Sequence, residues 1–115
     1  MYTNECREYA KHIAEEVTAL YNATGEERAR LEEEGEPSTL WDYLTEQALD
    51  IEYRADAEKK LIGVYVWVTI GGPSCWIDTH KARVVCSWGS DREEYPLRES
   101  VAEAITEYYR EIWDC

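Results

Sequence analysis

The sequence predicts a single α+β domain, and three observations lead to this fold class. The chain has 115 residues, which suits one domain around one hydrophobic core. Near both ends, apolar residues recur at the three- and four-residue spacing of amphipathic helices. In the middle, apolar and polar residues alternate, as they do in strands with one buried face. We therefore expect two N-terminal helices, an antiparallel meander of three to four strands and one C-terminal helix, all within residues 1–115.

The helical stripes set the positions of the expected helices. In residues 3–22 the stripe consists of Cys6, Tyr9, Ala10, Ile13, Val17, Leu20 and Tyr21. Residues 25–37 are dense in charge, so we expect a solvated loop or a weak helical turn there. A second, short helix is expected over residues 39–49, because Thr39 and Asp42 have a spacing like that of a capping box. The terminal helix is expected over residues 97–113.

Four segments alternate as strands do: residues 50–56, 61–70, 74–79 and 82–88. A turn at His80-Lys81 places Cys75 opposite Cys86. With this register, the apolar residues of both strands lie on the same face of the sheet. Across the loop at residues 70–73, the same criterion places Val66 opposite Ile77 and Val68 opposite Cys75. Residues 89–100 are expected to form a loop.

The expected sheet has an aliphatic face, and we predict that the helices pack on it. Ile62, Val64, Val66, Val68 and Ile70 share this face in the longest strand. The predicted core combines the aliphatic face with the helical stripes: Ile13, Val17, Leu20, Leu44, Val64, Val66, Val68, Ile77, Val84, Val101 and Ile105.

Net charge is the most unusual property of the sequence. Asp and Glu number 25 against 12 Lys and Arg, for a net charge of −13. Such a field repels nucleic-acid phosphates and anionic membranes and attracts basic partners. We therefore expect neither direct nucleic-acid binding nor membrane binding. The simpler explanation, that the acidity keeps a small protein soluble, stays open.

The sequence predicts a cytoplasmic protein without a metal or cofactor. No N-terminal segment resembles a signal peptide, and the longest apolar stretch, residues 61–70, is too short to span a bilayer. In a reducing cytoplasm the four cysteines are expected to be free thiols, and their spacing lacks the pattern of a zinc site. Cys75 and Cys86 would face each other and could form a disulfide under oxidation, but here we expect them to be small core residues.

Residues suited to catalysis are scarce, so we expect a protein that is not an enzyme. Its histidines are His12, on a helix face, and His80, at a hairpin tip. Gly71-Gly72 precedes a strand rather than a helix, and Pro73 lacks an amide donor, which disfavours a phosphate-binding loop.

The terminal helix carries a row of carboxylates at strict four-residue spacing: Glu99, Glu103, Glu107 and Glu111. Neighbours in the row are about 6 Å apart along the axis, close to the spacing of phosphates along a nucleic-acid strand. Asp91, Glu93 and Glu94 lie in the expected loop before this helix. These residues are the predicted partner-binding site, and the alternative is a solvated helix face.

The second candidate site is the aromatic face of the expected sheet. Tyr65, Trp67 and Trp76 share this face with Asp78 and Arg83. If no helix covers it, these aromatic residues are candidate anchors of a protein interface. If a helix does cover it, the face is simply a second core, and the sequence leaves both readings open.

The motifs GGPSCWIDT (71–79), VVCSWGSD (84–91) and YPL (95–97) follow one another closely in the chain. Over residues 61–97 they resemble a pattern of small uncharacterised proteins from bacterial phages and mobile elements, which have a GGPxxWIDT-like turn and a WG-D loop. Ser74-Cys75 after the proline departs from that pattern. The resemblance implies a setting, because small acidic phage proteins are often inhibitors of host defence nucleases, including anti-CRISPR and anti-restriction proteins. It implies no catalytic residues.

Charge, the glutamate row and this resemblance together predict a non-enzymatic DNA mimic in the bacterial host cell. It would bind the basic nucleic-acid site of a CRISPR effector or similar nuclease through acidic side chains. The alternative is an adaptor or homodimer that associates through the aromatic face, and the choice between monomer and homodimer stays open.

Overall fold

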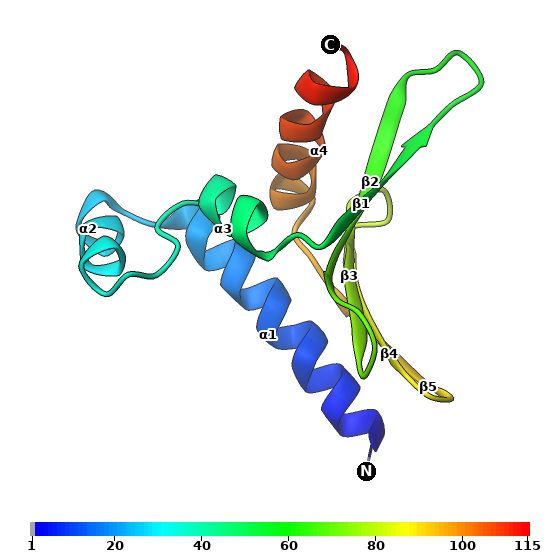
Figure 1. The fold of residues 1–115 in the computed structure, drawn as a ribbon, viewed down its shortest axis with the longest axis horizontal. Coiled ribbons are helices and arrows are strands. Elements are labelled where there is room, and N and C mark those ends of the chain that lie inside the picture. Colours follow the sequence, from blue (N-terminus) through cyan, green and yellow to red (C-terminus); the bar gives the residue numbers. More distant parts are fainter. Residues whose placement is uncertain (1) are drawn as a thin grey trace.

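The computed structural model describes residues 2–115 and has an α+β fold with all its helices on one side of a single antiparallel sheet (Figure 1). The sheet is a meander with strand order β1-β2-β3-β4-β5. The α+β class is confirmed, but residues 2–115 form five strands instead of three to four and four helices instead of three. In chain order the elements are α1 (Tyr2–Asn22), α2 (Gly25–Glu33), α3 (Leu40–Gln47), β1 (Asp50–Ala55), β2 (Leu61–Thr69), β3 (Ser74–Asp78), β4 (Arg83–Trp88), β5 (Asp91–Pro96) and α4 (Glu99–Trp113).

The fifth strand, β5, occupies a segment that was expected to be a loop. It pairs with β4, so that Glu93 lies opposite Cys86 and Tyr95 opposite Val84. Four consecutive charged residues, Asp91 to Glu94, begin β5, which hides the strand pattern in the sequence but suits the edge of a sheet. The loop expected over residues 89–100 is therefore wrong for residues 91–96.

The additional helix, α2, lies in the charged segment 25–37. Its start is held by a capping box, in which the Thr24 hydroxyl accepts from the Glu27 amide at 3.2 Å and Glu27 Oε1 accepts from the Thr24 amide at 3.0 Å. None of its residues is fully buried, and its half-buried Leu31 packs against the core. The cap of α3 forms as expected, since the Thr39 hydroxyl accepts from the Asp42 amide at 3.1 Å.

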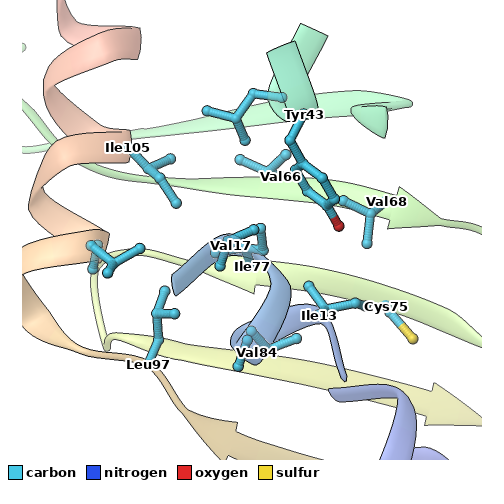
Figure 2. Close-up of a cluster of buried hydrophobic side chains, with 14 of the residues drawn as sticks. Ile13, Val17, Tyr43, Val66, Val68, Cys75, Ile77, Val84, Leu97 and Ile105 are labelled. Carbon is cyan, nitrogen blue, oxygen red and sulfur yellow. The ribbon is translucent and has the colours of Figure 1, made fainter. Parts of the chain in front are cut away.

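The hydrophobic core lies between the helices and the aliphatic face of the sheet. α1 packs across β4 and β5, and α4 packs on β2. Figure 2 shows Ile13 and Val17 of α1 lying over Ile77 and Val84, with Ile105 of α4 entering from the side. Every residue of the predicted core is buried in this cluster.

The expected register is confirmed for the β3–β4 hairpin, with Cys75 opposite Cys86 and Ile77 opposite Val84. Between β2 and β3 it is confirmed at Val66 and Ile77, but a bulge then places Thr69 rather than Val68 opposite Cys75. A second irregularity, between β1 and β2, leaves Ile62 exposed. Ile70 is also exposed. Alternation alone cannot locate such irregularities, so it did not predict that these two isoleucines are exposed.

A disulfide joins Cys75 to Cys86 across β3 and β4, with their Cα atoms 4.1 Å apart. The expectation of reduced thiols is therefore wrong for this pair. Both residues are buried beneath the helices, where the bond links neighbouring strands of the core. Cys6 is a buried free thiol and Cys115 an exposed one.

Substitution of a buried and of an exposed isoleucine tests where the core ends. Ile77 is fully buried, whereas Ile70 is 59% exposed. Because deleting buried methylene groups leaves a cavity, we expect Ile77→Ala to lower the free energy of unfolding by about 3 kcal/mol. Ile70→Ala should change it by less than about 0.5 kcal/mol. Urea denaturation followed by tryptophan fluorescence measures both, and equal effects would contradict this core.

Candidate protein-binding surfaces

A groove of about 560 Å³ runs between α4 and the tip of the β3–β4 hairpin. The hairpin contributes His80 and Lys81 to its walls. The helix contributes Glu99, Glu103, Glu107 and Arg110. The groove therefore collects part of the predicted glutamate row.

A buried carboxylate shapes the hairpin side of the groove. Asp78 is fully buried, and its Oδ1 accepts the Lys81 amide at 3.1 Å while its Oδ2 accepts the Arg83 Nε–H at 3.0 Å. The first contact closes the turn and the second ties the turn to β4. Beneath the tip lies Gly63 of β2, where a Cβ atom would come within 2.7 Å of the Cβ of His80. The missing side chain lets the hairpin tip lie directly on β2.

Two buried hydroxyl groups form the floor of the groove and link α4 to the sheet. Thr106 Oγ1 lies 2.8 Å from Thr79 Oγ1 and 3.0 Å from the carbonyl oxygen of Ala102. The Val64 amide donates to Thr79 Oγ1 at 2.8 Å. Both hydroxyls are thus satisfied within the protein, and the groove offers its charged walls, rather than its floor, to a partner.

The structure brings Glu99, Glu103 and Glu107 together but not Glu111. A step of four residues overshoots one turn of an α-helix by about 40°, so the row winds by about 120° from its first member to its last. All four side chains are exposed, yet only the first three line the groove. The predicted row is therefore a shallow spiral.

The carboxylates of the groove differ in their local partners. Glu107 forms an ion pair with Arg110, whose other amino group donates to the carbonyl oxygen of Leu61 at 2.9 Å. Within the described residues, the carboxylates of Glu99 and Glu103 accept no hydrogen bond and form no ion pair. These two carboxylates are available to a cationic group.

The acidic residues of β5 do not join this row. Glu94 points to the face without helices, where it forms an ion pair with Arg83. Asp91 and Glu93 have the opposite orientation and lie near Cys6 of α1. Burial raises the pKa of the Cys6 thiol, and these two charges raise it further. The predicted site is therefore divided, because strand alternation sends neighbouring residues to opposite faces.

The aromatic face of the sheet is not covered by any described helix (Figure 1). The Trp67 and Trp76 rings lie 4.5 Å apart between centroids, and the Tyr65 and Trp76 rings 6.4 Å apart. Trp76 at their centre is nevertheless only 7% exposed. The side chains of this open face bury one another.

Arginines complete the open face, and sequence reasoning missed two of them. Arg54 lies over the Tyr65 ring at 5.0 Å from its centroid, and Arg92 lies over Trp76 at 5.3 Å. Arg83 binds Asp78 and Glu94. Burial alone would lower the pKa of Arg83, but the hydrogen bond to Asp78 and the charge of Glu94 outweigh it and raise that pKa. Had residues 91–96 been recognised as a strand, the alternation of its side chains would have placed Arg92 on the same face as Glu94.

The described part of the chain contains neither a cluster of metal ligands nor a membrane-spanning helix. No three side chains among its His, Cys, Asp and Glu residues are grouped so as to hold a metal ion. None of its helices combines the length and apolar character needed to cross a membrane.

The close contact at Gly63 gives a test of how the groove is built. Gly63→Ala should lower the free energy of unfolding by about 2 kcal/mol, because the new Cβ meets the backbone of His80. In the matched control, Gly25→Ala, the new Cβ has no neighbour within 4 Å, and we expect a change of less than about 1 kcal/mol. Thermal and urea denaturation measure both, and equal effects would rule out the tight seating of the hairpin on β2.

Comparisons with known proteins do not assign a family. The resemblance of residues 61–97 to phage proteins therefore stays a prediction, and function must be argued from the surfaces themselves. The chain matches no protein-family model, no curated protein and no solved structure.

Proposed function

We propose that the protein is a non-enzymatic inhibitor that occupies a basic nucleic-acid-binding site on a host defence nuclease, such as a CRISPR effector. The observation that carries the proposal is the exposed glutamate row of α4, with Glu99 and Glu103 unpaired among the described residues. A basic site that normally holds phosphates would find carboxylates in their place.

The electrostatics of the whole chain support the same proposal. A net charge of −13 attracts a basic partner over distances longer than a contact. The glutamates then supply local charges about 6 Å apart along the helix axis. Because the row winds, its path is a shallow right-handed curve, as is the path of phosphates along a nucleic-acid strand. Such binding requires no catalytic residue.

The groove suggests where a cationic side chain of the nuclease would bind. Lys81 and Arg110 stand on opposite walls and leave the carboxylates between them as the acceptors for a partner's cationic side chain. Because Arg110 is tied to both Glu107 and β2, it helps to fix the position of the helix. An arginine or lysine of the nuclease would enter between α4 and the hairpin tip.

Two variants with the same net charge test the proposal. The first changes Glu99, Glu103, Glu107 and Glu111 to Gln, and the control changes the exposed Glu26, Glu33, Glu34 and Glu36 to Gln. Each is expressed in cells whose CRISPR or restriction system targets a plasmid. We expect the wild type and the control to restore transformation by that plasmid and the α4 variant to lose at least about tenfold, because it lacks the contacts that replace phosphates.

The matched control separates position from total charge. If both variants lose protection equally, net charge alone acts and the α4 site is wrong. If the wild type protects against no system in a panel of CRISPR and restriction types, inhibition itself is contradicted. For a system that responds, competition with target DNA on the purified effector should weaken steeply as ionic strength rises.

A second candidate function is an adaptor or homodimer that associates through the open face. It is supported by the position of the helices, which all lie on the other side of the sheet. Tyrosine, tryptophan and arginine, the residues of this face, are the types most often found at the centres of interfaces.

Sedimentation of the purified protein tests the homodimer version of this second function. If the open face is the contact, Trp67→Ala should shift the dimer towards monomer by about tenfold in dissociation constant, because it removes a half-buried anchor. Trp41→Ala, on the helix side, should leave that constant unchanged. A dimer that is indifferent to Trp67→Ala excludes the open face as its contact.

A further inference from the structure

The two edges of the sheet are protected to different degrees. At one edge, α1 packs against β5, and that strand ends in a proline. At the other edge lies β1, whose second side pairs with no strand in the described part of the chain. The β1–β2 hairpin also extends away from β3, β4 and β5 (Figure 1). β1 is therefore the accessible edge.

The backbone of β1 has groups directed away from β2. Alternate residues of an antiparallel strand direct their N–H and C=O groups to opposite sides. The Ile51 N–H is one of the outward groups, because it donates to Asp50 Oδ1 at 2.9 Å instead of to β2. Tyr53, two residues further, has the same orientation. An incoming strand would find these groups after displacing one side chain of β1.

Apolar side chains lie exposed beside this edge on the helix side. Leu49, immediately before β1, is 62% exposed, and Trp113 of α4 is 37% exposed. Tyr53 of β1 joins them, since its ring stacks on Trp113 at 5.3 Å between centroids. A strand added to β1 would cover part of this apolar surface, which water now contacts.

The charges of β1 identify the strand that fits. On the open face its side chains run acidic, acidic, basic: Asp50, Glu52 and Arg54. If the same strand pairs with it in the antiparallel direction around Glu52, Asp50 lies opposite Arg54 of the second copy, twice by symmetry. On the helix side the same register places Ile51 opposite Tyr53 of the second copy. Both faces of the strand are then self-complementary, apart from the two Glu52 side chains that meet at the centre.

We infer that β1 pairs with β1 of a second copy of this chain, so that two sheets become one continuous sheet. The like-charged Glu52 side chains at the centre oppose this pairing, but each carboxylate is held on its own sheet by the Trp67 indole N–H at 3.1 Å. The inference does not depend on the glutamate row of α4.

Salt dependence gives this dimer a signature of its own. Two copies that each carry a net charge of −13 repel one another, and salt screens that repulsion. The pairing itself rests mainly on backbone hydrogen bonds and apolar contacts, which salt affects less. The dimer should therefore strengthen as ionic strength rises, whereas binding to a basic nuclease should weaken.

Sedimentation velocity of the purified full chain tests this at about 0.05 M and about 0.5 M sodium chloride. We expect the dimer dissociation constant to fall at the higher salt. Arg54→Glu should raise that constant by at least about tenfold, because it places two like-charged pairs across the two-fold axis. Asp50→Arg combined with Arg54→Glu exchanges the charges and should restore the dimer. Arg28→Glu, the same charge change on the exposed surface of α2, is the matched control and should leave the constant unchanged at the higher salt.

The double exchange keeps the test valid if Arg54→Glu disturbs the stacking on Tyr65. Circular dichroism of every variant reports whether the fold is kept. A wild-type chain that stays monomeric at both salt concentrations overturns the inference. So does a dimer that Arg54→Glu leaves intact, or one that the double exchange fails to restore.

Discussion

The buried carboxylate of Asp78 holds together the parts of the protein on which both candidate surfaces depend. It closes the β3–β4 turn through the Lys81 amide and binds Arg83, which in turn reaches Glu94 of β5. The turn brings one wall of the α4 groove onto β2, while the strand register sends Trp76 to the opposite side. One buried carboxylate, whose hydrogen bonds are all made within the protein, thus links three strands and helps to position both faces of the sheet.

The two faces of the sheet shield their apolar side chains from water in different ways. On the helix side, aliphatic side chains exclude water by close packing. On the open side, aromatic rings are shielded by arginines of the same sheet, such as Arg54 and Arg92, whose charged ends remain in water. A domain this small can therefore leave one face of a sheet without helices and still keep a central tryptophan almost fully buried. Most of its excess negative charge is left to the helices.

Sequence patterns predicted the parts of the fold that follow from regular periodicity. The core and the β3–β4 register follow from alternation, because a one-residue slip would expose residues such as Ile77. The bulges near Val68 and Ile62 break that alternation and depend on contacts between strands, so no local pattern reveals them. β5 and α2 were missed because their stability comes from edge pairing and from a cap, with few apolar side chains to mark them. For the same reason sequence patterns grouped residues that the fold separates: Glu99, Glu103 and Glu107 of the candidate site share one groove, whereas the acidic residues of β5 lie on other surfaces.

The winding of the glutamate row would limit how many of its carboxylates the proposed partner could contact at once. A flat surface laid against the groove could meet the first three carboxylates, while Glu111 has already turned away from it. Only a partner that curves around the helix, as the walls of a nucleic-acid cleft do, could engage all four at once. If α4 binds a nuclease as proposed, the number of its carboxylates in contact would therefore depend on how far the partner surface curves around the helix.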